Sequence, residues 1–173
     1  MVQPSNLPRN AIFARSFGRH PDVISLPSSV TIRNAFLDFN LAPLELRRDI
    51  GMLGALWKIA HGTAHKLLQE MFPMCDFKPA LQNTRGASRR HRLRFVDRCI
   101  GDQLVQFSRS LFGLVRVWND LPAHIVEIND VKTFRSRLTA CSRNACRENA
   151  DGWASMYSTD SFPRLLIRHY YDS

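Results

Sequence analysis

Apolar side chains recur at alternating steps of three and four residues in the middle of the chain, which is the spacing of one helical face. The first such series consists of Leu46, Ile50, Leu53, Trp57 and Ala60. Pro43 suits the first turn of a helix, and Gly62 suits a left-handed cap at its end. The pattern therefore predicts a long amphipathic helix between these two residues, with one buried face.

A second, shorter helix is expected from Thr63 to about Phe72, because Pro73 cannot continue it. We expect its apolar side chains to be buried, and they are Leu67, Leu68 and Phe72. The first two helices would then pair as a helical hairpin.

Two more amphipathic helices are predicted after an irregular stretch over residues 74–86. The apolar face of the third helix consists of Phe107, Leu111, Leu114, Trp118 and Leu121. Pro122 then breaks this helix. Asn129 or Asp130 can cap the fourth helix, which should fray near Gly152. Its apolar face consists of Val131, Phe134, Leu138 and Cys141.

These elements predict a mainly α-helical fold, a small domain of about four amphipathic helices with a basic loop and a disordered N-terminal lead. We expect residues 1–33 to form a weakly ordered basic lead, because four prolines interrupt them. The helical domain is expected over 34–150, and an aromatic tail without a firm secondary structure over 151–173. The predicted core consists of Leu46, Ile50, Leu53, Trp57, Leu67, Leu111, Leu114, Trp118, Phe134 and Leu138.

The composition agrees with a folded domain and adds a strong positive charge. Of the 173 residues, 45% are apolar and 23% are charged, which argues against collagen-like and wholly disordered chains. Four cysteines are too few for a disulfide-stapled secreted domain, so a reducing compartment is expected. No apolar run reaches the length of a membrane span. The net charge of +9 is due mostly to arginine, whose planar fork suits phosphate, so an anionic partner such as nucleic acid is expected.

Arginine is densest just before the third predicted helix. The candidate nucleic-acid-binding residues there are Arg85, Arg89, Arg90, Arg92 and Arg94. Several cations along one phosphate backbone gain affinity by releasing counterions, and His91 and Phe95 could stack on exposed bases. The alternative is a solvated basic loop that only aids solubility. A second basic set could extend this surface or be an ordinary exposed helix face, and it consists of Arg135, Arg137, Arg143 and Arg147.

Catalytic and metal-binding signatures are weak, so we expect no catalytic residue, metal or cofactor. His61 and His65 have the spacing of a zinc protease helix, but Gly62 stands where the general base is needed. Cys141 and Cys146 resemble half of a zinc knuckle, but no second pair completes it. Nucleophile motifs and glycine-rich phosphate loops do not occur in the sequence.

Four segments in this order resemble a known family. They are AFLDFNLAPLELRRDIGMLGALWKIAHGT, TRGASRRHRLRF, FSRSLFGLVRVWNDLP and VKTFRSRL. From Ala35 to Leu138 the chain resembles the region downstream of the polymerase core in non-LTR (LINE-type) retrotransposon reverse transcriptases. The most specific element is a Trp-Asn-x-Leu-Pro motif followed by a phenylalanine, that is, Trp118, Asn119, Leu121, Pro122 and Phe134. We expect these five residues to be structural, with the indole in the core and the asparagine bonded to backbone at the helix end.

The resemblance implies a chain without polymerase activity. Members of the family copy RNA into DNA with a carboxylate triad that includes a Tyr-x-Asp-Asp turn, and this sequence has no such turn. We therefore expect a non-catalytic C-terminal remnant of such a polyprotein, a basic accessory segment that binds RNA or DNA beside an upstream polymerase core. The location would be the nucleus or cytoplasm, or less readily the mitochondrion, given the basic lead. The alternative function is a helical protein-interaction module without a nucleic-acid role.

Overall fold

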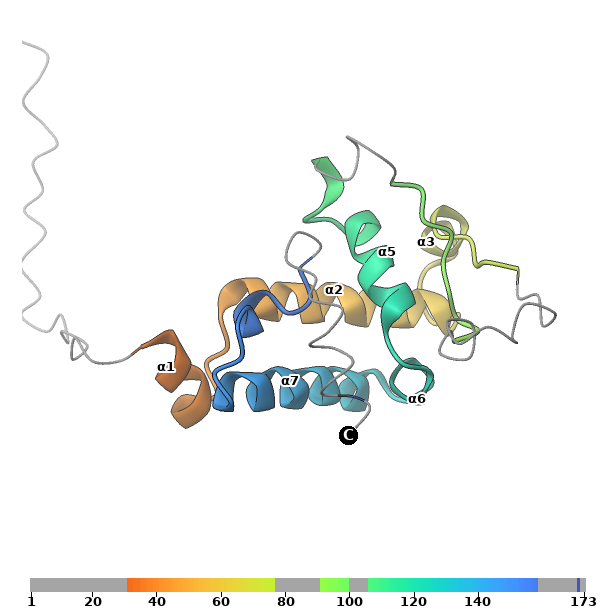
Figure 1. Ribbon diagram of the computed structural model, residues 1–173. Coiled ribbons are helices and arrows are strands. Elements are labelled where there is room, and N and C mark those ends of the chain that lie inside the picture. Colours follow the sequence, from red (N-terminus) through yellow and green to blue (C-terminus); the bar gives the residue numbers. More distant parts are fainter. Residues whose placement is uncertain (1–30, 77–90, 100–105, 159–170, 172–173) are drawn as a thin grey trace, which may run out of the picture. The chain divides into compact units, whose positions relative to one another are not determined.

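The structure is a computed structural model that describes residues 31–76, 91–99, 106–158 and 171. Within these residues it has six α-helices and a short 3₁₀ turn, and no β-strand (Figure 1). The predicted mainly α-helical fold is therefore confirmed. The folded unit begins at Thr31. The predicted lead lies outside the described residues up to residue 30, and its last three residues, 31–33, belong to the folded unit.

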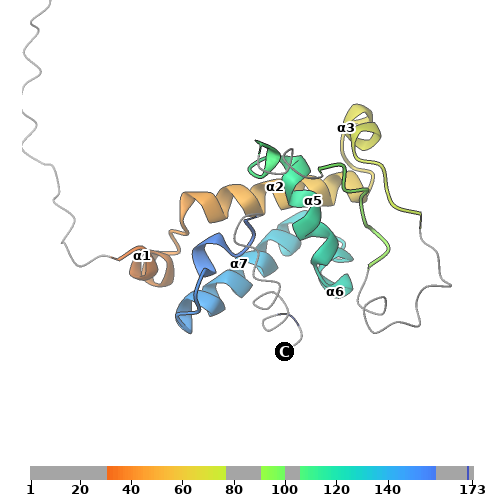
Figure 2. The same ribbon diagram turned by 45° about the horizontal axis from the view of Figure 1, so that its top comes forward.

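Three helices form the centre of the domain: α2 (Leu44–Ala60), α5 (Leu111–Asp120) and α7 (Val131–Arg147). Figures 1 and 2 show α2 and α7 side by side, and α5 packs against α2. The end of α2 follows the predicted signal, since Gly62 has a φ of 70°. The start of α7 does too, because the Asp130 carboxylate accepts a hydrogen bond from the Thr133 amide at 2.8 Å.

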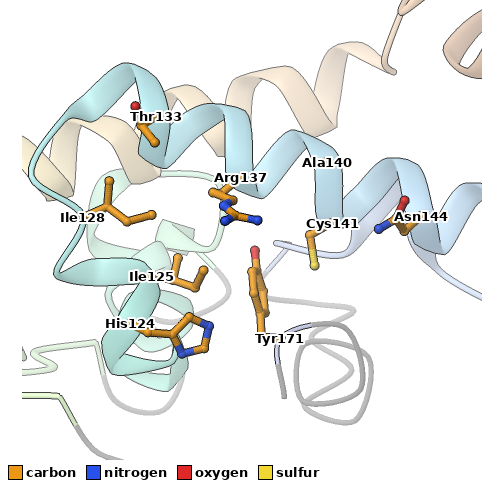
Figure 3. Close-up of a pocket in the computed structure, with 9 residues that line it drawn as sticks. All are labelled: His124, Ile125, Ile128, Thr133, Arg137, Ala140, Cys141, Asn144 and Tyr171. Atoms are coloured by element: carbon orange, nitrogen blue, oxygen red, sulfur yellow. The ribbon is translucent and has the colours of Figure 1, made fainter. Parts of the chain in front are cut away.

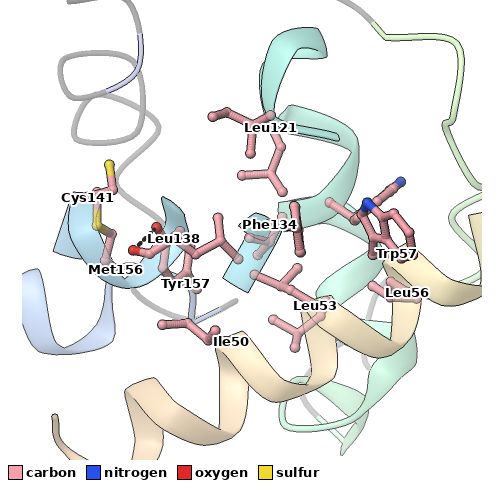
Figure 4. Close-up of a cluster of buried hydrophobic side chains, with 14 of the residues drawn as sticks. Ile50, Leu53, Leu56, Trp57, Leu121, Phe134, Leu138, Cys141, Met156 and Tyr157 are labelled. Carbon is pink, nitrogen blue, oxygen red and sulfur yellow. Dashed lines mark hydrogen bonds between the residues drawn. The ribbon is translucent and has the colours of Figure 1, made fainter. Parts of the chain in front are cut away.

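The core follows the predicted apolar faces of these helices, as Figure 4 shows. Eight of the ten predicted core residues are buried, and Leu111 is partly buried against them. The core also takes in residues beyond 150. Met156 and Tyr157 are fully buried behind the 3₁₀ turn η2 (Trp153–Ser155), and the Tyr157 hydroxyl donates to the carbonyl of Leu138 at 3.0 Å. The start of the predicted aromatic tail is thus part of the domain.

The second predicted helix is shorter and more exposed than the sequence indicates. Helix α3 covers only Lys66–Met71, and Leu67 and Leu68 are 63% and 40% exposed, so the prediction that they are buried is wrong. Phe72, directly after the helix, is buried and packs on Phe95. Because α3 has under two turns, one anchoring residue at its end is enough to fix it, and its own apolar side chains face outward.

A helix that the periodicity does not reveal, α1 (Ile32–Phe39), opens the domain. It is tied to α7 by two arginines that reach each other's helix ends. Arg33 donates from Nε to the carbonyl of Cys146 at 3.0 Å and from Nη2 to that of Arg147 at 2.9 Å. In return, Arg143 donates from α7 to the carbonyl of Leu37. Each guanidinium therefore satisfies carbonyls in the last turn of the other helix, which have no partner within that helix.

Helix α2 buries a carboxylate, Asp49, that is only 2% exposed. Its Oδ1 accepts from Arg48, but its Oδ2 has no hydrogen-bond partner among the described residues. Burial therefore raises the pKa of Asp49. Since leucine has nearly the same shape and a better helix propensity, we expect Asp49→Leu to raise the free energy of unfolding by about 1 to 2 kcal/mol at pH 7.

Urea unfolding at several pH values checks this expectation. A carboxyl group whose pKa is raised by folding destabilises the folded protein while it is ionised. The gain in unfolding free energy of Asp49→Leu over wild type should therefore be largest at neutral pH and shrink as the pH falls toward 4. Arg48→Leu, which removes only the partner, is the matched control and should destabilise the protein. A loss of stability in Asp49→Leu at pH 7 would contradict the expectation.

Candidate nucleic-acid interface

The end of helix α5 holds a segment of the predicted arginine cluster in place. Trp118 is fully buried, and its Nε1 donates to the carbonyl of Leu93 at 2.5 Å. The backbone carbonyl of Trp118 lies 2.9 Å from Nε2 of His91. We call residues 91–96 the anchored segment.

The side chain of Asn119 hydrogen-bonds to the anchored segment in the way that the backbone of a neighbouring β-strand would. Its Oδ1 accepts from the amide of Phe95 at 2.9 Å, and its Nδ2 donates to the carbonyl of Phe95 at 2.8 Å. The prediction that the asparagine bonds backbone at the helix end is wrong, because both of its bonds go to the backbone of Phe95. One amide side chain thus satisfies both polar groups of a buried residue 24 positions away.

The opposite edge of the anchored segment pairs with residues 73–75. The amide of Cys75 donates to the carbonyl of Arg94 at 2.7 Å, and the amide of Val96 donates to that of Pro73 at 2.9 Å. These bonds form an isolated antiparallel bridge between Met74 and Phe95. The segment is therefore fixed from both sides although the described residues form no regular sheet around it.

This extended backbone sorts the side chains of the anchored segment into two faces, because successive side chains of a strand point to opposite sides. His91 and Phe95 are 2% and 1% exposed. Arg92 and Val96 alternate with them and are exposed. Arg92 thus faces outward between two residues that are buried in the core, whereas Arg94 is half-buried. The hypothesis that His91 and Phe95 stack on bases is wrong, because both rings are buried.

The predicted arginines are only partly within the described residues. Arg85, Arg89 and Arg90 lie outside them. Arg92 is exposed, and Arg94 is half-buried, with an Nε atom that has no hydrogen-bond partner among the described residues.

An ion pair fixes the chain just beyond the anchored segment. Arg116 of α5 donates from Nε to Oδ2 of Asp97 at 2.6 Å and from Nη2 to the carbonyl of Cys99 at 2.9 Å. No sequence signal predicts this pair, whereas Leu93, Phe95 and Val96 carry a brief signal for a short strand or extended segment, which is what the structure has there. The alternation of apolar and basic residues indicates the same extended segment.

Helix α7 is the second basic element, with five Lys and Arg and no acidic residue between its ends. Arg137 is exposed. Arg135 is exposed but reaches across α2, where its Nη2 lies 3.4 Å from the carbonyl of Gly51. A Cβ atom at Gly54 would meet the guanidinium of Arg135, which would have to shift. Arg135 therefore contributes to helix packing as well as to the surface charge.

Trp118 connects the two basic elements. It binds the anchored segment through its indole nitrogen, and its ring lies 5.8 Å from the ring of Phe134 on α7. Leu121 is fully buried, and Pro122 is the N-cap of the short helix α6 (Ala123–Val126). The motif residues singled out in the sequence thus join α5, α6, α7 and the anchored segment.

The histidine and cysteine pairs lie in structural positions. His61 is 2.9 Å from the carbonyl of Val126 through Nε2 and stacks on Trp57, and Nδ1 of His65 accepts from the Leu67 amide. In the part of the chain that the structure describes, no three His, Cys, Asp or Glu side chains gather as metal ligands would. The described helices include none that is long and apolar enough to cross a bilayer.

No protein-family model, curated protein or solved structure matches the chain. The resemblance to non-LTR reverse transcriptases therefore stays a prediction from the residues of the four segments.

Proposed function

We propose that the chain is a non-catalytic, basic segment that binds RNA or DNA through arginine and phosphate contacts, as the region downstream of a non-LTR reverse transcriptase core would. The observation that supports this most is the anchored segment. Its arginines alternate with residues that hydrogen-bond to Trp118 and Asn119. The backbone that carries these arginines is therefore held in place in the absence of nucleic acid. A fixed backbone lowers the entropy lost on binding.

Three buried cysteines, Cys99, Cys141 and Cys146, do not have the properties of catalytic nucleophiles. Burial raises the pKa of Cys99 and Cys146, and it raises that of Cys141 to about 11. All three thiols therefore stay protonated near neutral pH, whereas a nucleophilic cysteine needs a thiolate.

The salt dependence of binding tests the proposal. With a fluorescent 20-nucleotide single-stranded RNA, the logarithm of the association constant should fall steeply and linearly with the logarithm of the salt concentration. A segment variant neutralises three arginines of the predicted cluster, two directly before the anchored segment and one within it. It should reduce this slope by about 2, since each lost phosphate contact removes about 0.7. The three substitutions are Arg89→Gln, Arg90→Gln and Arg92→Gln.

A second triple variant controls for net charge. It removes three exposed cations from α2 and α3 by Arg47→Gln, Lys58→Gln and Lys66→Gln. If the proposal is correct, this control lowers the slope much less than the segment variant does. Equal slopes for the two variants, or binding that ignores salt, would overturn it.

A second candidate function, a protein-interaction module, is favoured by the apolar surface around Phe72. Several large apolar side chains there are between 39% and 63% exposed, namely Leu67, Leu68, Met71, Met74, Val96 and Phe107. Contiguous apolar surface of this kind is typical of docking sites. A chain that ignores RNA and DNA at low salt, but self-associates less after Leu67→Gln and Met71→Gln in light scattering, would support this function instead.

A further inference from the structure

A pocket of about 420 Å³ lies between α6 and the outward side of α7. Figure 3 shows Arg137 and Asn144 on α7 and His124 on α6, with Tyr171 standing between His124 and Asn144 in this view. Its volume is in the range of small-molecule sites. Ile125 and Ala140 add apolar wall, so the pocket combines apolar and polar surfaces.

Tyr171 lines one side of this pocket and is 9% exposed. Its hydroxyl is 2.7 Å from that of Tyr157, which is fully buried. Tyr157 gives its only proton to the carbonyl of Leu138, so Tyr171 is the donor in the bond between the two hydroxyls. The ring of Tyr171 is therefore fixed, and it meets His124 edge to face with the ring centroids 6.4 Å apart.

The polar groups of the pocket suit a planar ligand that bears a negative charge. Arg137 supplies the positive charge, and none of the lining side chains that the structure describes is acidic. The oxygen of the Asn144 side chain already accepts from Arg147 at 3.0 Å, which leaves its NH₂ group as a donor. Burial keeps the Cys141 thiol neutral by raising its pKa to about 11, so no thiolate repels an anion.

From this geometry we infer that the pocket receives one unpaired nucleotide of a bound single strand. The base stacks on the exposed ring of His124, the NH₂ group of Asn144 donates to a base carbonyl, and Arg137 pairs with the adjacent phosphate. Tyr171, which is buried, supports the His124 ring from the side. Base stacking on aromatic rings is a general means of holding single strands. The inference rests on the proposed nucleic-acid binding and adds the site where a base is recognised.

Filling the pocket tests the inference without changing the charge. Ala140 is exposed on α7 and lines the pocket, so Ala140→Phe would occupy the space of the base while the helix keeps its surface. Ser136→Phe is the matched control, because Ser136 is equally exposed on α7 but does not line the pocket. Circular dichroism confirms that both variants fold. Binding is measured with a ten-nucleotide oligouridine and with an abasic oligonucleotide of the same length, which offers phosphates without bases.

The outcomes separate the pocket from the general charge. We expect wild type and Ser136→Phe to bind oligouridine at least tenfold more tightly than the abasic strand, and Ala140→Phe to lose this preference while still binding both. Equal binding of the two strands by wild type, or an unchanged preference in Ala140→Phe, overturns the pocket and leaves the salt-dependent binding intact. Failure to bind either strand at low salt overturns the pocket and the proposed function together.

Discussion

Replacing Trp118 by alanine is expected to lower the free energy of unfolding by about 4 kcal/mol, because the largest fully buried side chain of the domain would leave a cavity. The loss also includes the hydrogen bond from its indole nitrogen to Leu93 and the ring contact with Phe134. Urea unfolding followed by circular dichroism measures the change. A loss below about 1 kcal/mol would contradict the central position of this residue.

Because such a loss can approach the whole stability of a small domain, a milder variant isolates the hydrogen bond. Trp118→Phe keeps an aromatic ring but removes the donor to Leu93. We expect this variant to fold, with faster hydrogen exchange at the amides of Phe95 and Val96. In the wild type these amides are protected by hydrogen bonds to the Asn119 side chain and to the carbonyl of Pro73. Trp153→Phe, at a partly buried tryptophan that stacks on Phe36, is the control and should leave those two amides unchanged.

Acid should weaken the fold through His91. This ring is 2% exposed, and burial lowers the pKa of His91 from 6.5 to about 4. Because the folded protein resists protonation that the unfolded chain accepts, the contribution of His91 is complete above pH 6.5 and is lost as the pH falls to 4. A shift of this size corresponds to about 3 kcal/mol.

Comparison with His91→Gln separates this effect from the other titrating groups. The glutamine amide can still donate to the Trp118 carbonyl, but it does not titrate between pH 4 and 6.5. The difference in unfolding free energy between wild type and variant should therefore shrink by about 3 kcal/mol over that interval. A difference that stays constant with pH would show that His91 can be protonated in the folded state.

The long helices could be predicted because their sequences contain both a periodic apolar face and a capping signal. Asp130 and Gly62 are such signals, and both lie where the sequence places them. Helix α1 was missed because it has eight residues and buries only Phe36. The exposure of Leu67 and Leu68 could not be foreseen either, because periodicity identifies a helix but not what covers a short one.

The candidate interface was predictable as residue types but not as a geometry. The density of arginine indicated where an anion would bind, and the Trp-Asn-x-Leu-Pro motif indicated a constrained helix end. The sequence could not show that the motif hydrogen-bonds to Leu93 and Phe95. Leu93 lies 25 positions from Trp118 and Phe95 lies 24 positions from Asn119, so only the fold brings them together. Likewise, the pocket joins α6, α7 and Tyr171, and no local pattern relates these parts of the chain.

The arginine exchange between α1 and α7 has a consequence for synthesis on the ribosome. Arg33 and its acceptor at Cys146 are 113 residues apart, so α1 emerges long before the helix that completes it. At cellular translation rates this delay is roughly 6 to 23 s. Throughout that time Phe36, which is fully buried in the finished domain, has no α7 to pack against. Until α7 has been made, the nascent chain therefore exposes the apolar side chain of Phe36 to chaperones.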